Sequence, residues 1–215
     1  MKDNIALIGF MGSGKSTIGR VLAKFLDMKF VDIDRLIAAR EKKTIPEIFA
    51  EKGEAYFRKL ERDIVYEESL ENNIVIATGG GVIIDNENIK ALRETSYVVY
   101  LDCTIDCIYD RVRNSKTRPL LNVENMYEKI KDLHSKREIL YKISADFTVK
   151  IDKSSNMYDT AEKIKQAYIY GNNLLTWTNY TGYDPELSGG VLTPGKDSSK
   201  YPRKREFGIG FNVGF

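Results

Sequence analysis

The sequence contains few of the residues that build disulfide frameworks and metal centres. Two cysteines and one histidine occur among its 215 residues. Cys103 and Cys107 lack the further partners that a disulfide framework or a zinc site needs, so we expect two reduced thiols. The histidine, His134, lies in a helical pattern rich in lysine and aspartate. We expect it at the surface, without a catalytic role.

Long apolar runs and an excess of charge of one sign are also missing. No stretch approaches the roughly 18 apolar residues of a membrane helix, and the opening MKDNIALIGF is too short an apolar run for a signal peptide. The formal net charge is +2, which gives no reason to expect a nucleic-acid surface. We therefore expect a cytoplasmic protein, with no membrane or nucleic-acid partner for residues 1–170.

Up to about residue 170 the chain alternates short apolar runs with longer helical patterns. Strands are predicted at 4–10, 29–34, 73–79, 96–102 and 146–152. Apolar residues at three- and four-residue spacing predict helices at 15–26, 35–43, 45–71, 86–94, 105–114, 125–143 and 157–170. This alternation predicts an α/β fold in which helices cover both faces of a five-stranded parallel sheet.

The strongest functional signal is GFMGSGKST at residues 9–17, which fits the phosphate-binding P-loop G-x-x-x-x-G-K-[ST]. A predicted strand precedes it and a helical pattern follows. The glycines let the backbone wrap a phosphate, and the helix N-terminus adds partial positive charge. Lys15 is placed for the β- and γ-phosphates and Ser16 for Mg²⁺. The predicted nucleotide-binding residues here are Gly12, Ser13, Gly14, Lys15, Ser16 and Thr17.

The ends of the next two strands predict an acceptor site. VDID places Asp32 and Asp34 on one face of a strand at its carboxyl end, where open α/β sheets bind ligands. Asp32 is a candidate for holding Mg²⁺ through water, and Asp34 for accepting a hydrogen bond from a substrate hydroxyl. The alternative is that Asp34 only caps the following helix. TGGGVI, with Gly79, Gly80 and Gly81, indicates a backbone pressed against a ligand.

Basic side chains complete the candidate set. Arg58 and Glu61 lie one helical turn apart and face the same way. Arg137 has Tyr141 four residues later, and Arg118 is the charged tip of KTRPLLN, which has the composition of a mobile loop. Each of these, taken alone, is more often a solvated charge than a ligand.

The motifs GFMGSGKST, DID, IPEIFAEKGEAYFRKLE, ATGGG, TRPLL, REILY and ADFTV follow one another along residues 1–170. In this order and spacing the set resembles the shikimate kinase family over that whole length. The resemblance implies a P-loop kinase fold with a mobile lid. It also implies transfer of the γ-phosphoryl group of ATP to the 3-hydroxyl of shikimate. The products are shikimate 3-phosphate and ADP, in aromatic amino-acid (chorismate) biosynthesis.

The same resemblance assigns roles to the candidate residues. It implies that shikimate is held by Asp34, Arg58, Gly79, Gly80, Gly81 and Arg137, with Glu61 bracing the pocket. It implies that Arg118 comes from a lid over the phosphates and that Arg111 lies against the adenine. The catalytic set is then Lys15, Asp34 and Arg118, with Mg²⁺ as cofactor on Ser16 and Asp32.

Elementary chemistry agrees with these roles. Arg58 and Arg137 supply planar forks for the shikimate carboxylate, and Asp34 suits its hydroxyls. Asp34 either orients the 3-hydroxyl or also takes its proton. Two other functions stay open: a P-loop kinase acting on gluconate or a nucleoside monophosphate, and a nucleotide-binding module without catalysis. We expect the chain to be a monomer.

From residue 171 the composition changes. Eight of the sixteen glycines, three of the five prolines and the only tryptophan lie in the last 45 residues. We expect no helix there and place a domain boundary near 170, between 1–170 and 171–215. The closing EFGIGFNVGF alternates apolar residues with glycine and asparagine, which predicts a strand with one apolar face.

Residues 172–215 resemble the last two strands of TonB-dependent outer-membrane receptors of the polysaccharide-utilisation type, with Phe215 as the terminal aromatic. Two strands cannot close a barrel, and in a membrane both edges of a lone hairpin would stay unpaired. We therefore expect a non-functional appendage, hairpin-like or disordered, on a kinase formed by residues 1–170.

Overall fold

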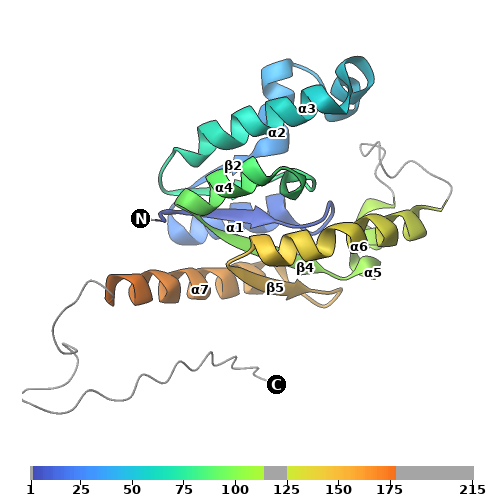
Figure 1. Ribbon diagram of the computed structural model, residues 1–215. Helices are drawn as coiled ribbons and strands as arrows, with labels where there is room; N and C mark the ends of the chain where they lie inside the picture. Colours follow the sequence, from blue (N-terminus) through green and yellow to red (C-terminus); the bar gives the residue numbers. More distant parts are fainter. Residues whose placement is uncertain (1, 114–124, 178–215) are drawn as a thin grey trace, which may run out of the picture. The chain divides into compact units, whose positions relative to one another are not determined.

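The computed structural model describes residues 2–113 and 125–177, with side chains placed as far as residue 169 (Figure 1). The predicted lid with Arg118 and the predicted strand at 206–215 lie outside the described residues. Contacts divide the chain into two units, Met1–Ile169 and Tyr170–Phe215. The sheet belongs to the first unit. In the part of the chain that is described, no helix is long and apolar enough to cross a membrane.

The first unit is built on a five-stranded sheet in the order β2-β3-β1-β4-β5. The strands are β1 (Asn4–Ile8), β2 (Lys29–Asp32), β3 (Ile74–Ala77), β4 (Ser96–Cys103) and β5 (Phe147–Ile151). All neighbouring pairs are parallel. Every residue of β1 and β3 is buried, and because successive side chains point to opposite faces, both faces are covered. The predicted parallel sheet is confirmed.

Helices occur at each predicted position. They are α1 (Lys15–Leu26), α2 (Ile33–Glu41), α3 (Ile45–Ser69), α4 (Asn86–Thr95), α5 (Ile105–Val112), α6 (Met126–Ser144) and α7 (Met157–Trp177), with a short 3-10 helix η1 (Val82–Ile84). Helix α3 is broken at Gly53, whose φ of 77° lies in the left-handed region that favours glycine. Cys103 and Cys107 are free and buried, as predicted for reduced thiols.

The prediction that helical structure ends near residue 170 is wrong. Helix α7 continues through Trp177 and so includes the first residues of the segment expected to be an appendage. Residues 171–177 contain no proline, and one glycine inside a helical pattern lowers helix stability without ending the helix. The change of composition at 171 therefore does not coincide with the end of secondary structure.

Candidate active site

The P-loop joins β1 to α1 and needs glycine at three positions. Gly9, Gly12 and Gly14 have φ values of 147°, 83° and 100°, where other residues are strained. A Cβ on Gly9 would lie 2.8 Å from the Leu101 carbonyl oxygen, and one on Gly12 2.7 Å from Val112 Cγ1. The loop therefore wraps closely against β4 and α5. Its backbone leads directly into the amino end of α1, where unpaired N–H groups attract phosphate.

Lys15 lies over this loop. Its side chain is buried, with 8% exposed, and Nζ donates to the carbonyl oxygens of Gly9 at 2.7 Å and Phe10 at 3.0 Å. A lysine ammonium is a compact charge with three rotatable donors, which can pass from carbonyl to phosphate oxygens. The geometry thus places one cation at the centre of the loop.

Arg111 reaches the same loop from α5, almost a hundred residues later. Its Nη1 donates to the carbonyl oxygens of Gly12 and Ser13, both at 3.2 Å. A Cβ on Gly14 would lie 3.5 Å from that nitrogen. The structure therefore brings Arg111 together with the predicted nucleotide-binding residues.

The two aspartates of VDID do not lie as predicted. Strand β2 ends at Asp32, and α2 begins at the next residue, because Asp32 Oδ1 accepts a hydrogen bond at 3.2 Å from the backbone N–H of Arg35. Asp32 is therefore the helix cap, and Asp34 lies in the first turn of α2. The predicted shared face on one strand is wrong, and so is the alternative that Asp34 caps the helix.

The glycine triplet follows β3, and other site residues crowd against it. A Cβ on Gly79 would lie 2.6 Å from Glu61 Oε1 and 2.9 Å from Asp34 Oδ1. A Cβ on Gly81 would lie 2.5 Å from Arg58 Nη1, well inside van der Waals contact distance. A side chain at either position would displace the charged groups that α2 and α3 place against this backbone.

The triplet also contacts the P-loop. A Cβ on Gly80 would lie 3.0 Å from the backbone nitrogen of Met11, tighter than ordinary van der Waals contact. The candidate acceptor site and the candidate phosphate site are therefore adjacent, which transfer of a group between two bound molecules requires.

Arg58 and Glu61 form a largely buried ion pair at this site. Arg58 Nη1 lies 2.7 Å from Glu61 Oε2, and Glu61 is fully buried. Burial raises the pKa of Glu61, while the positive charge of Arg58 opposes that rise. Arg58 also bonds Glu54 through Nη2 at 3.1 Å, a partner that sequence reasoning missed although it lies at i−4 on the same helix.

Helix α6 adds two donors to the same turn. Arg137 Nη1 donates to the Gly80 carbonyl oxygen at 3.4 Å, and the Tyr141 hydroxyl donates to it at 2.5 Å. The Tyr141 ring is fully buried and stacks on Tyr100 at 5.0 Å between centroids. Burial raises the pKa of Tyr141, so its hydroxyl stays a donor. Sequence reasoning noted Tyr141 only for its spacing from Arg137 and gave it no role.

The prediction that His134 lies at the surface is wrong. Only 8% of the residue is exposed. It shares the buried stripe of α6 with Ile130, Tyr141 and Ser144, whereas the lysines and aspartates around it lie on the outer faces. Burial lowers the pKa of His134, which favours the neutral imidazole.

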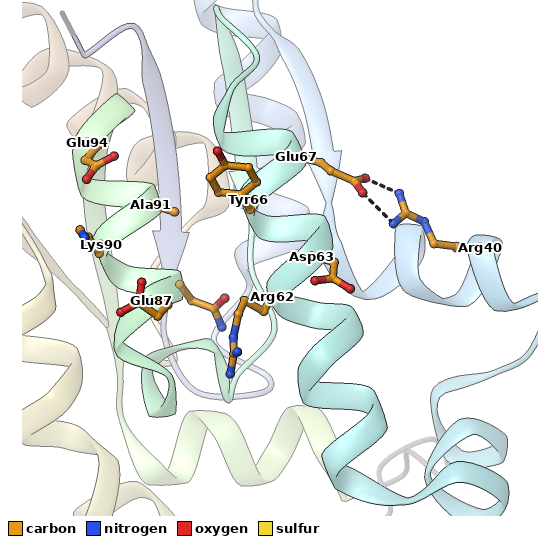
Figure 2. Close-up of a pocket in the computed structure, with 10 residues that line it drawn as sticks. Arg40, Arg62, Asp63, Tyr66, Glu67, Glu87, Lys90, Ala91 and Glu94 are labelled. Carbon is orange, nitrogen blue, oxygen red and sulfur yellow. Dashed lines mark hydrogen bonds and ion pairs between the residues drawn. The ribbon is translucent and has the colours of Figure 1, made fainter.

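A charged hollow of about 630 Å³ lies between α3 and α4 (Figure 2). Its lining residues are Arg40, Arg62, Asp63, Tyr66, Glu67, Glu87, Asn88, Lys90, Ala91 and Glu94. Arg40 and Glu67 form an ion pair at its edge. None of the ten is a predicted site residue, and none belongs to the P-loop. The hollow therefore lacks the groups that phosphoryl transfer needs.

Comparisons with known proteins cover the same part of the chain. A family model described as shikimate kinase matches residues 11–168. The shikimate kinase of Dechloromonas aromatica (strain RCB) is 46% identical over 148 residues, 69% of this chain and 81% of that protein. The shikimate kinase of Sulfurihydrogenibium sp. (strain YO3AOP1) is 43% identical over 152 residues, 71% of this chain and 90% of that protein.

A solved structure gives the same result in three dimensions. Shikimate kinase from Acinetobacter baumannii in complex with shikimate has a TM-score of 0.77 to this chain at 38% identity. The match covers 81% of this chain and 96% of the other.

Proposed function

This chain belongs to the shikimate kinase family, and we propose that its ATP site is the P-loop and its shikimate site the turn Gly79–Gly80–Gly81. The chain phosphorylates the 3-hydroxyl of shikimate with ATP, giving shikimate 3-phosphate and ADP. One observation carries the division into two sites. The triplet contacts the P-loop backbone at Gly80, while charged side chains from α2, α3 and α6 converge on the triplet.

The acceptor site suits a small hydroxylated acid. Arg58 and Arg137 are the proposed partners of the shikimate carboxylate, because a guanidinium fork matches two carboxylate oxygens. Glu61 holds Arg58 from the buried side at 2.7 Å. Asp34, beside Gly79, is the proposed acceptor for a substrate hydroxyl. A site that binds hydroxyls through a charged group rejects analogues that lack them.

The proposed catalysis depends mainly on positioning the phosphoryl group and stabilising its charge. In a loose transition state, negative charge spreads over the equatorial oxygens, so fixed cations supply most of the stabilisation. Lys15 lies within the loop that would hold the phosphates. Asp34 orients the 3-hydroxyl and is the carboxylate placed to accept its proton. Arg118, outside the described residues, is the proposed lid cation, and Arg111 the proposed adenine contact.

The residues proposed for Mg²⁺ have suitable donors. Ser16 offers a hydroxyl in the first turn of α1, and Asp32 a carboxylate at the end of β2. Mg²⁺ prefers oxygen ligands, keeps several waters, and binds through one or two protein oxygens and the substrate phosphates. When bound with ATP it neutralises charge on the β- and γ-phosphates.

Replacing Asp32 tests this assignment without removing the helix cap. Asn caps helices about as well as Asp, so Asp32→Asn keeps α2 while it removes the negative charge. We expect the Mg²⁺ concentration for half-maximal velocity to rise about tenfold, in the range reported for weakened metal ligation. Asp27→Asn, at the exposed end of α1, is the control. An unchanged Mg²⁺ requirement in Asp32→Asn would remove Asp32 from the metal site.

Residues 178–215 are proposed to take no part in catalysis. All proposed site residues lie before them, and the resemblance of 172–215 to receptor strands offers no kinase element. We also propose that the chain acts as a cytoplasmic monomer, because one chain supplies every proposed group. A truncation that tests this proposal should end the chain after Trp177 rather than before residue 171, because α7 continues to Trp177.

Deleting residues 178–215 should leave kcat and both KM values within about twofold of the full chain, because the truncation removes no proposed contact. Shikimate-dependent ADP formation and thermal unfolding are measured on both proteins, with elution volume as a check on association. A large loss of activity or thermal stability in the shorter protein would contradict the proposal.

A further inference from the structure

Helix α6 contains a buried histidine that none of the steps above uses. The His134 ring lies 5.7 Å from the Phe10 ring, centroid to centroid, at an interplanar angle of 58°. Its Nε2 is buried and has no hydrogen-bond partner among the described residues. An imidazole in this state acts as an aromatic packing group, and the ring that it packs against belongs to the P-loop.

Phe10 is a fixed point of that loop. The residue is 1% exposed. Its carbonyl oxygen accepts hydrogen bonds from Lys15 Nζ at 3.0 Å and from the backbone N–H of Ser13 at 3.1 Å. A shift of the Phe10 ring would therefore move a carbonyl that positions the P-loop lysine. His134 contacts Phe10, and the Phe10 carbonyl oxygen bonds Lys15, so His134 is linked to the P-loop lysine through Phe10.

We propose that His134 is a positioning residue for ATP, whose neutral ring holds Phe10 and thereby sets the P-loop carbonyls that place Lys15. The proposal rests on the proposed ATP site. It does not make His134 a catalytic residue, because the contact passes through Phe10. It adds a specific role for one α6 side chain, beside those of Arg137 and Tyr141 at the glycine triplet.

The charge of His134 matters for this role. Glu138 on α6 and Asp102 at the end of β4 favour the protonated ring, while Lys142 on α6 opposes it. Burial outweighs them and lowers the pKa of His134 below its ordinary value of about 6.5. The neutral ring is therefore present at neutral pH. Burial disfavours the protonated ring, so protonation in acid would favour movement of His134 out of its packed position against Phe10 and thereby weaken ATP binding as pH falls.

The test separates packing from charge with two substitutions at one position. His134→Ala removes the ring, whereas His134→Phe keeps an aromatic ring that cannot be protonated. At pH 8 we expect His134→Ala to raise KM for ATP about tenfold, since small misplacements of reactive groups have effects of this size or larger. KM for shikimate should stay within about twofold, because Arg58 and Arg137 are untouched. His134→Phe should restore the wild-type KM for ATP.

The pH profile is the second readout. The ratio of KM for ATP in wild type to that in His134→Phe should be close to one at pH 8 and rise as pH falls below about 6.5. Lys136→Ala, an exposed position two residues along α6, is the matched control. The ratio does not depend on whether His134→Ala folds, so it decides the proposal where that variant is unstable.

Three results would overturn the proposal. One is an unchanged KM for ATP in folded His134→Ala, and another is an equal rise of both KM values, which indicates a general structural role. The third is a ratio that stays constant with pH. Failure of the ATP site itself is seen separately, as undiminished ATP binding and turnover in Lys15→Ala.

Discussion

Lys15→Ala is expected to lower kcat by at least about 10²- to 10³-fold, the loss found when one preorganised donor is removed from a developing negative charge. Lys15 Nζ is held by the carbonyl oxygens of Gly9 and Phe10, inside the loop that would surround the β- and γ-phosphates. Alanine keeps the helix but leaves the transferring phosphoryl group without this cation. Shikimate-dependent ADP formation under saturating ATP measures the loss.

Lys24→Ala is the control for this substitution. Lys24 is exposed and lies in the last turn of the same helix, so it removes an equal charge from α1 outside the loop. Its kcat should stay close to that of wild type. Near-normal turnover in Lys15→Ala would contradict the assignment of the P-loop.

Arg58→Ala is expected to raise KM for shikimate about 30- to 140-fold, as follows from losing a charge-assisted pair of about 2–3 kcal/mol. The guanidinium faces Gly81 and is braced by Glu61, so alanine removes the fork and leaves the brace in place. KM for ATP should stay within about twofold, because in the described part of the chain Arg58 forms its hydrogen bonds with Glu54 and Glu61 and none with the P-loop. Initial rates over a grid of both substrates measure the two constants.

Two further variants serve as controls for this test. Removing Arg58 also leaves Glu61 buried without its cation, so part of any loss could come from destabilisation. Arg58→Lys keeps a charge near Glu61 but not the planar fork, and should still bind shikimate weakly. Arg62→Ala, on the same helix and half exposed, removes an arginine that pairs with Asp85 and should behave as wild type. A fall in ATP affinity in Arg58→Ala would place Arg58 in the nucleotide site instead.

The parts of this fold that could be predicted depend on local pattern. Buried strands such as β1 and β4 contain continuous apolar runs at 5–8 and 98–101, and such runs can be recognised without knowing what packs against them. The P-loop could be predicted equally well, because its left-handed glycines and the following lysine form one continuous segment. Residue types and their spacing were therefore enough to predict the sheet and the phosphate site.

The parts that could not be predicted depend on tertiary contacts. The burial of His134 is set by which face of α6 meets the P-loop, and the polar residues around it conceal that face. The guanidinium group of Arg58 lies against Gly81, which explains why this position is a glycine. In the sequence, the three glycines indicated only that some group approaches closely, without identifying it. The position of Asp34 was not predicted, because Asp32, two residues earlier, caps α2 and Asp34 therefore lies inside the helix.

The most direct test of the two-site account is calorimetric titration of shikimate and of the ATP analogue AMP-PNP with Mg²⁺ into wild type, Arg58→Ala and Lys15→Ala. The account predicts that Arg58→Ala loses shikimate affinity and keeps AMP-PNP affinity. It also predicts that Lys15→Ala keeps shikimate affinity while AMP-PNP binding weakens. Equal loss of both ligands in either folded variant, or the opposite pairing, would contradict the division between the P-loop and the glycine triplet.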